Sequence, residues 1–249
     1  MLAATGLACS APDDASSPVV VSAASSLTDV VTQLARAYAA GQRGVTITTN
    51  FASSGTLVQQ IRQGAGVDLF IAAAAREMDL LAAEGLIDGA TRRVIASNEL
   101  VLVASDETEA VTGLADLGGA AVERIDLGAP ASVPAGAYAR EALQRAGLWA
   151  AVEQKAVFTT NVRQALAYVE RGDVDAALVY RTDALTSAGI RVVAVAPLPP
   201  GAIPYPAAVV AGSSKREGAL RFLEFASGPQ GVAIFQEHGF GPPAHVGRR

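Results

Sequence analysis

The stretch VVVSAASSLTDVVTQLARAYAAG, residues 19–41, changes its apolar period half-way along. Its first three residues, Val19 to Val21, form a continuous apolar run, which indicates a short buried strand. From Leu27 onward the apolar residues recur three and four positions apart, the spacing of an amphipathic helix, and Gly41 ends the pattern. The stretch therefore predicts a strand, a junction of small polar residues and a helix.

The same order of strand and helix recurs along the rest of the chain. Apolar runs and alternation predict further strands at residues 45–51, 68–72, 100–104, 125–127, near 157, and at 176–180, 192–195 and 207–210. Helical spacing predicts helices around 57–61, 78–86, 134–146 and 162–171, and two more that end near His238. Strands that alternate with helices form parallel sheets covered by helices, so we expect an α/β fold whose sheets are mainly parallel.

The composition is that of a globular protein. Of the 249 residues 51 % are apolar and 17 % are charged, which suits one large domain or two small ones. Past the N-terminus no apolar run approaches the length that a bilayer requires, so we expect no spanning helix. The formal net charge of -5 argues against a nucleic-acid partner, which requires a basic surface.

The motifs of common enzymes are missing from the sequence. It has neither a Gly-x-Ser-x-Gly elbow nor a phosphate loop, and the GAG segment at 64–66 precedes a strand, the wrong order for a dinucleotide turn. The histidines are His238 and His245, both near the C-terminus, so a Ser-His-Asp relay or a histidine metal site is not expected. We therefore expect a protein that is not an enzyme and holds no directly coordinated metal.

Small or polar residues begin four of the predicted helices. These junctions are SSLTD (25–29), ASSGT (52–56), VPAG (133–136) and NVRQ (161–164). In the first, Ser26 and Asp29 have the spacing of a capping box, so we expect Ser26 to be the N-cap. A helix N-terminus exposes unpaired N–H groups that can hold an anion, and in open α/β sheets such junctions gather at one edge. Ordinary capped helices share the pattern, so it favours an anion site without requiring one.

Six segments together resemble the motif series of the periplasmic molybdate-binding protein family. They follow the family's order with similar spacing: SSLT (25–28), FASSGTL (51–57), AGVDLFI (65–71), VPAGAYA (133–139), NVR (161–163) and LVY (178–180). Near the C-terminus GPQ (228–230), IF (234–235) and GF (239–240) resemble the end of the family's sequences. The resemblance covers about residues 19–240 and is specific as a set.

This resemblance implies a two-lobed periplasmic-binding-protein fold, a Venus flytrap, with one oxyanion held between the lobes. Lobe 1 is expected to comprise residues 19–97 plus 205–249 and lobe 2 residues 98–204, while residues 1–18 are a signal remnant and tether. Crossing segments near residues 96–98 and 204–206 are expected to form the hinge.

The resemblance also implies five donors to the anion, two on lobe 1 and three on lobe 2. They are the hydroxyl and N–H of Ser26 and Ser54, the N–H of Ala135 and Val162, and the phenol of Tyr180. Molybdate, tungstate and sulfate are dianions that only accept hydrogen bonds, so a site of donors suits them and rejects protonated phosphate. We expect molybdate or tungstate as the ligand, no cofactor, and a metal that is bound only as its oxyanion.

Two residues beside these donors carry expectations of their own. Arg163, next to Val162, could clamp an anion, but we interpret it as a solvated helix residue. Gly55 stands where serine is common in the family, and we expect it to loosen the turn that carries Ser54.

The family further implies a monomeric solute-binding protein that delivers its anion to the membrane permease of an ABC importer. Three alternatives are a sulfate-type oxyanion binder, an enzyme on a related flytrap fold, and the ligand-binding domain of a transcription factor. The enzyme requires a catalytic base at the cleft and the transcription factor a DNA-binding segment, and we expect neither.

Cys9 is the single cysteine and cannot form an internal disulfide. It follows small apolar residues and precedes a polar, proline-containing segment, which resembles the end of a bacterial lipoprotein signal. The basic region and most of the apolar region of such a signal are absent, and Gly6 stands where a larger aliphatic residue is usual. We expect Cys9 to be lipidated and the protein to be extracytoplasmic, the alternative being a disordered tail with an incidental cysteine.

Overall fold

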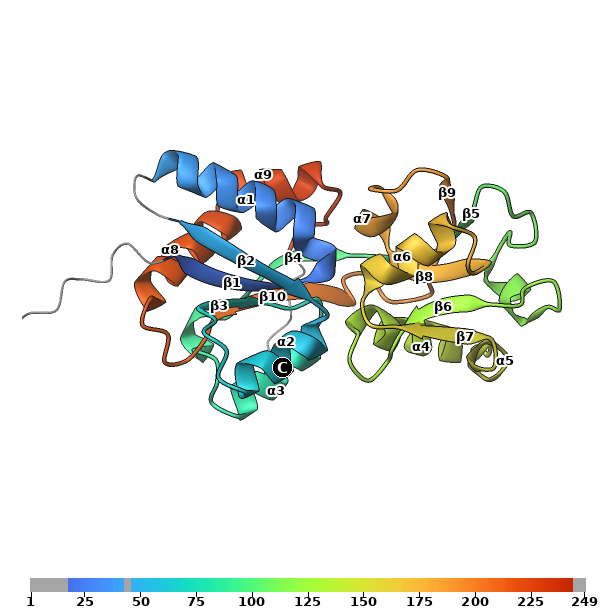
Figure 1. Cartoon of the computed structure of the whole chain (residues 1–249), viewed down its shortest axis with the longest axis horizontal. Coiled ribbons are helices and arrows are strands. Elements are labelled where there is room, and N and C mark those ends of the chain that lie inside the picture. Colours follow the sequence, from blue (N-terminus) through green and yellow to red (C-terminus); the bar gives the residue numbers. More distant parts are fainter. Residues whose placement is uncertain (1–17, 43–45, 244–249) are drawn as a thin grey trace, which may run out of the picture.

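The computed structural model describes residues 18–42 and 46–243, which form two five-stranded sheets with helices around each (Figure 1). The first sheet has the order β2-β1-β3-β10-β4. Its strands are β1 (Val19–Ala24), β2 (Ile47–Ala52), β3 (Leu69–Ile71), β4 (Arg93–Asn98) and β10 (Ile203–Val209). We refer to this sheet and its helices as lobe 1.

The second sheet, with its helices, forms lobe 2 and has the order β7-β6-β8-β5-β9. Its strands are β5 (Leu100–Ser105), β6 (Ile125–Gly128), β7 (Ala156–Thr159), β8 (Ala176–Tyr180) and β9 (Ile190–Val195). The two sheets have the same pattern of neighbours, each with two parallel and two antiparallel pairings.

Helices cover both faces of each sheet (Figure 1). Lobe 1 carries α1 (Thr28–Gly41), α8 (Arg216–Ser227) and α9 (Pro229–Glu237) on one side, and α2 (Ser54–Arg62) and α3 (Ala75–Ala83) on the other. Lobe 2 carries α4 (Pro134–Arg145), α5 (Trp149–Glu153), α6 (Val162–Glu170) and α7 (Arg181–Ala184). Short 3₁₀ turns lie at Ser25–Leu27, Gly89–Thr91 and Leu114–Gly118.

Alternation along the strands divides the core of lobe 1 into two clusters. Phe70 packs with residues of α2 and α3, including Leu57 and Met78. Its neighbours Leu69 and Ile71 belong to a larger core that continues into lobe 2. Successive side chains of a strand point to opposite faces, so β3 is buried on both sides by its own sequence.

The chain crosses between the lobes in two places. β4 of lobe 1 passes directly into β5 of lobe 2, and β10 returns to lobe 1 after β9. The two crossing strands β4 and β10 pair with each other, so the crossings lie side by side. β4 ends at Asn98 and β10 begins at Ile203, both inside the range predicted for lobe 2, and the predicted boundaries stay a prediction.

The predicted α/β fold of two lobes is confirmed, but the sheets are mixed rather than mainly parallel. The antiparallel pairings all involve β5 or β10, the strands that enter a sheet from the other lobe. A helical crossover within one sheet makes neighbouring strands parallel, whereas a strand that arrives from elsewhere is free to run the other way. Strand β4 and the short helices α5 and α7 were not predicted.

No helix within the described ranges has the length and apolar character needed to cross a membrane.

Candidate functional site

One small cavity between the lobes brings together all five residues that the sequence nominated. Its free volume is about 10 Å³, and it is lined by Ala24, Ser25, Ser26, Ser53, Ser54, Ala73, Val133, Pro134, Ala135, Val162 and Tyr180. A cavity needs about 10–15 Å³ of such space to hold one water molecule, so this cavity leaves room only for a very small ligand. The role of the five residues in binding stays a prediction.

Three of these residues lie at the start of helices whose first N–H groups have no acceptor within the helix. Ser54 is the first residue of α2, Ala135 the second of α4, and Val162 the first of α6. These N–H groups therefore remain available to a ligand, together with the positive end of each helix dipole. The helices follow β2, β6 and β7, whose carboxyl ends face the gap between the lobes (Figure 1).

Local capping explains why two of these helices begin where they do. The Ser53 side chain accepts a hydrogen bond from Thr56 N at 3.3 Å, and Asn161 accepts one from Gln164 N at 3.0 Å. Both are N-cap contacts of the usual kind. Asn161 is thus the N-cap of α6.

The capping box predicted for Ser26 is wrong. Residues Ser25–Leu27 form a 3₁₀ turn, and α1 begins only at Thr28 without a side-chain cap. This turn directs Ser26 toward β10, where its Oγ lies 3.1 Å from Tyr205 Oη. Ser26 is 3 % exposed and still lines the cavity, so its hydroxyl connects the site to the hinge.

Ser54 has one of its acceptor positions occupied by the protein. Its Oγ accepts a hydrogen bond from Ala73 N at 3.0 Å, and the side chain is fully buried. A hydroxyl that accepts from the backbone still has its own proton to donate. That proton is available to the cavity.

Tyr180 has an unpaired phenol beside the cavity. The residue is 1 % exposed, and its Oη has no hydrogen-bond partner in the part of the chain that the structure describes. Burial raises the pKa of the Tyr180 phenol well above its ordinary value, so the group is a neutral donor at physiological pH. An unsatisfied buried hydroxyl costs about 1–3 kcal/mol, which a ligand acceptor would recover.

Arg163 is not the solvated helix residue that we expected. Its Nη2 lies 2.7 Å from Asp29 Oδ2 at the start of α1, and its Nε lies 2.6 Å from Asp183 Oδ1 in α7. Its side chain is 29 % exposed, whereas that of Asp183 is fully buried. Because Asp29 belongs to lobe 1 and Arg163 to lobe 2, this ion-pair cluster joins the lobes next to Val162.

The two carboxylates and the guanidinium of this cluster influence one another strongly. Burial raises the pKa of the Asp183 carboxyl to about 7, against the lowering effect of the Arg163 charge. Burial alone would lower the pKa of Arg163, but Asp183 and Asp29 outweigh it and raise that pKa. Arg163 therefore stays charged and offsets the burial of Asp183.

Gly55, which we expected to loosen its turn, also lets the two lobes come into contact. Its N–H donates to Ser132 O at 3.0 Å, so the backbones of the two lobes meet here. A Cβ on residue 55 would lie 2.4 Å from Ser132 O, closer than real Cβ atoms come. Glycine at this position lets the lobes touch beside Ser54.

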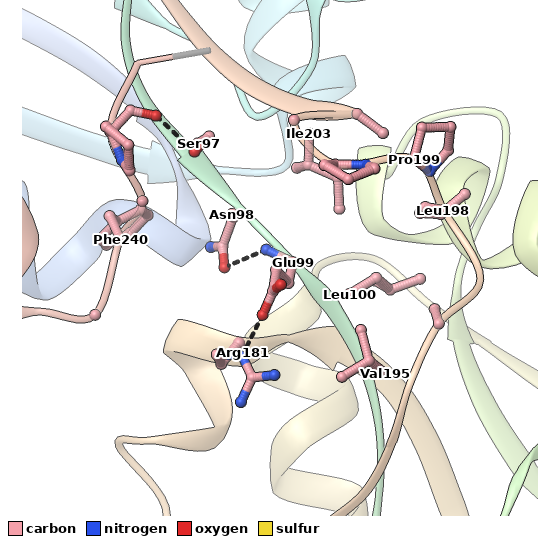
Figure 2. Close-up of a pocket in the computed structure, with 17 residues that line it drawn as sticks. Ser97, Asn98, Glu99, Leu100, Arg181, Val195, Leu198, Pro199, Ile203 and Phe240 are labelled. Carbon is pink, nitrogen blue, oxygen red and sulfur yellow. Dashed lines mark hydrogen bonds and ion pairs between the residues drawn. The ribbon is translucent and has the colours of Figure 1, made fainter.

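A second and larger cavity lies at the crossing segments and contains none of the five nominated residues. Its free volume is about 380 Å³, and Figure 2 shows Glu99, Arg181, Leu198, Ile203 and Phe240 around it. Arg181 and Glu99 form an ion pair within it. This cavity is lined mainly by the crossing segments between the lobes, whereas the small cavity is lined by hydrogen-bond donors.

Two lobes around a small donor-lined cavity are an architecture shared with known proteins. A family model described as bacterial extracellular solute-binding protein matches residues 19–241. The chain belongs to this family.

Individual solute-binding proteins are similar to the chain over most of its length. It is 38 % identical over 224 residues to YvgL of Bacillus subtilis strain 168, assigned as an ABC transporter substrate-binding lipoprotein, a match that covers 89 % of this chain and 85 % of YvgL. It is 38 % identical over 233 residues to the molybdate-binding protein ModA of Escherichia coli strain K12, covering 89 % of this chain and 88 % of ModA.

A solved structure agrees with these relatives. The substrate-binding domain assigned to a molybdenum ABC transporter of Clostridium difficile has a TM-score of 0.70 and 34 % identity, over 91 % of this chain and 99 % of that domain. Together the matches confirm that the chain is a member of the molybdate-binding protein family, whose proteins are substrate-binding components of ABC transporters.

Sequence reasoning missed several residues of this solute-binding protein that support the site. Tyr205 contacts Ser26 across 179 positions of sequence, and Asp183 lies next to the nominated Tyr180 yet pairs with Arg163. An aspartate three residues after the nominated tyrosine, just past the end of a predicted strand, was a signal that could have been used. For Tyr205 the sequence held no local signal.

Replacing Gly55 with alanine is expected to keep the lobes apart. The added methyl group would collide with Ser132 O of the other lobe. The stability of helix α2 should rise slightly, because alanine is a better helix former than glycine. With millimolar molybdate present, small-angle X-ray scattering should give a larger radius of gyration for Gly55→Ala than for wild type. Gly66→Ala is the matched control, since nothing lies within 4 Å of its Cβ. Identical scattering of Gly55→Ala and wild type would contradict this role.

Proposed function

We propose that this protein captures molybdate or tungstate in the small cavity between its lobes and presents it to the membrane permease of an ABC importer. The observation that carries the proposal is the convergence of donors from both lobes on one small cavity, including the unpaired Tyr180 phenol. The names of the E. coli and C. difficile relatives supply the ligand class.

The chemistry of the lining supports a fully deprotonated anion. Within the described ranges the lining residues are alanine, serine, valine, proline and tyrosine, so the cavity presents neither a carboxylate nor a basic side chain. Backbone N–H groups and hydroxyl protons would bind the anion through partial charges alone. This also explains how a protein with a net charge of -5 can hold a dianion.

The division of donors between the lobes supports a clamp. Ser26 and Ser54 belong to lobe 1, whereas Ala135, Val162 and Tyr180 belong to lobe 2. A ligand that contacts both sets stabilises the arrangement in which the lobes touch, and it can shift the equilibrium only by that differential affinity. The function is therefore binding and release, and the lining supplies no group that could act as a catalytic base.

We place the protein outside the cytoplasm, as a monomer held at the membrane through a lipid on Cys9. Cys9 lies outside the described residues, so this part of the proposal rests on the sequence around it and on the lipoprotein assignment of the B. subtilis relative.

Thermal melts with different oxyanions are expected to rank as molybdate and tungstate together, then sulfate, then phosphate. A ligand that binds only the folded state adds RT ln(1 + [L]/Kd), about 4 kcal/mol at a thousandfold excess over Kd. Sulfate has the same charge and shape but is smaller, so donors fixed on two lobes cannot all reach it. A sulfate shift equal to that of molybdate would favour a general sulfate-type binder, and no shift with any of the four anions would exclude the proposed function.

Tyr180→Phe is expected to weaken molybdate binding without destabilising the fold. It removes a hydroxyl that has no partner within the described chain, so the melting temperature without ligand should stay the same or rise. A hydrogen bond to a charged ligand is worth about 1.5–3 kcal/mol, so the molybdate Kd should increase about 10- to 100-fold by titration calorimetry. Tyr168→Phe, a hydroxyl on the same lobe that contacts Gln164 instead, is the control and should bind like wild type. Wild-type affinity in Tyr180→Phe would remove the phenol from the site.

Cys9→Ser is expected to release the protein from the membrane. A single acyl chain binds membranes only marginally, whereas the several chains of a bacterial lipoprotein anchor stably. In cells that express the full-length gene, the wild-type protein should fractionate with membranes and the variant with the soluble fraction. Wild-type protein found entirely in the soluble fraction would refute the anchor and leave the anion site untouched.

A further inference from the structure

A buried polar network lies directly behind the cavity, at the point where the chain crosses between the lobes. Asn98 ends β4, Tyr205 lies in β10 and Thr182 in α7, and all three are buried. Asn98 Nδ2 lies 3.1 Å from Tyr205 Oη and 2.8 Å from Thr182 Oγ1, and Tyr205 Oη lies 3.1 Å from Ser26 Oγ. The network therefore runs from the hinge to a donor of the anion site.

The backbone fixes the orientation of the Asn98 amide. Its Oδ1 accepts a hydrogen bond from Glu99 N at 2.9 Å, a contact that Figure 2 shows. The NH₂ group must then face Tyr205 and Thr182. An amide nitrogen has two protons and no free acceptor capacity, so Asn98 donates to both hydroxyls.

This orientation leaves a single arrangement for the Tyr205 proton. Tyr205 Oη already accepts from Asn98, and within the described chain its remaining hydrogen-bond partner is Ser26 Oγ. Burial raises the pKa of the Tyr205 phenol far above its ordinary value, so the proton is retained. Tyr205 therefore donates to Ser26, and Ser26 has its own proton left for the cavity.

We propose that Asn98 and Tyr205 are specificity-determining residues, which hold the Ser26 hydroxyl as a donor and so make the site reject anions that carry a proton. The proposal rests on the proposed function and deepens it. Ser54 is held in the same way by Ala73 N, and a backbone N–H can only donate. With one Ser26 lone pair taken by Tyr205, the Ser26 proton is directed at the cavity, where the proton of hydrogen phosphate would compete with it.

Tyr205→Phe tests this role because it removes the donor to Ser26 and keeps the aromatic ring. The ring packs edge-on against Tyr180 and Phe240 at centroid distances of 5.9 and 5.4 Å, contacts that phenylalanine preserves. Ser26 Oγ would then be free to accept a proton from the ligand. The readout is the ratio of the Kd of phosphate to that of sulfate, each obtained by displacement of bound molybdate at mildly alkaline pH.

Sulfate and hydrogen phosphate carry the same charge there and differ by one proton, so general effects on anion binding cancel in the ratio. We expect the ratio to fall about 5- to 100-fold in Tyr205→Phe, the range for relieving one unsatisfied hydrogen bond. Asn98→Asp is the second variant. Its carboxylate accepts from Tyr205 and draws that proton away from Ser26, so the ratio should fall here too, although both affinities weaken.

A double-mutant cycle with Ser26→Ala separates orientation from packing. Without the Ser26 hydroxyl there is nothing to orient, so adding Tyr205→Phe to Ser26→Ala should leave the ratio unchanged. A ratio that stays at the wild-type value in both Tyr205→Phe and Asn98→Asp would overturn the proposal and leave the proposed function standing. Wild-type protein that binds neither molybdate nor sulfate would refute the proposed function itself.

Discussion

Unpaired hydrogen-bond donors on two separate lobes face one small cavity, and the rest of the molecule is arranged around them. Each N–H or O–H group that is removed from water without an acceptor costs free energy, so bringing the lobes together over an empty cavity is unfavourable at the site. In the proposed function, a dianion between the lobes would supply acceptors to all the donors at once. The same groups that oppose closure without the ligand would then favour closure with it, so that closure would depend on the ligand.

The contacts between the lobes must be strong enough to hold the closed form and few enough to be reversed. Gly55 provides one backbone contact with Ser132, and Arg163 bridges Asp29 and the buried Asp183. Ion pairs of this kind contribute little net stability, because desolvation offsets most of the attraction. They fix the relative position of the lobes, and hence of Val162 N–H, without holding the cleft permanently shut.

The sequence predicted the donor residues better than the residues that hold them in place. The reason is that the donors are encoded by nearby residues, whereas their supporting contacts join distant parts of the chain. Ser54, Ala135 and Val162 stand at strand-to-helix junctions, where propensity, capping and motif spacing all act within a few residues. Ser26 was nominated correctly as a lining residue, but its capping box was not formed because a 3₁₀ turn precedes α1. The contact of Ser26 with Tyr205 and the antiparallel pairing of β5 and β10 depend on chain crossings that no local pattern encodes.

Rejection of a protonated anion depends on a difference between backbone and hydroxyl donors. The N–H groups of Ala135 and Val162 can never accept a proton, so they exclude protonated ligands by their chemistry alone. Hydroxyls both donate and accept, and a protein donor on one of their lone pairs favours the orientation in which they donate to the ligand. Ala73 N does so for Ser54 and Tyr205 does so for Ser26, whereas no described donor reaches Tyr180 Oη. In the proposed site a protonated anion could therefore donate most easily to Tyr180, and the phenol proton would then be left without an acceptor among the described residues.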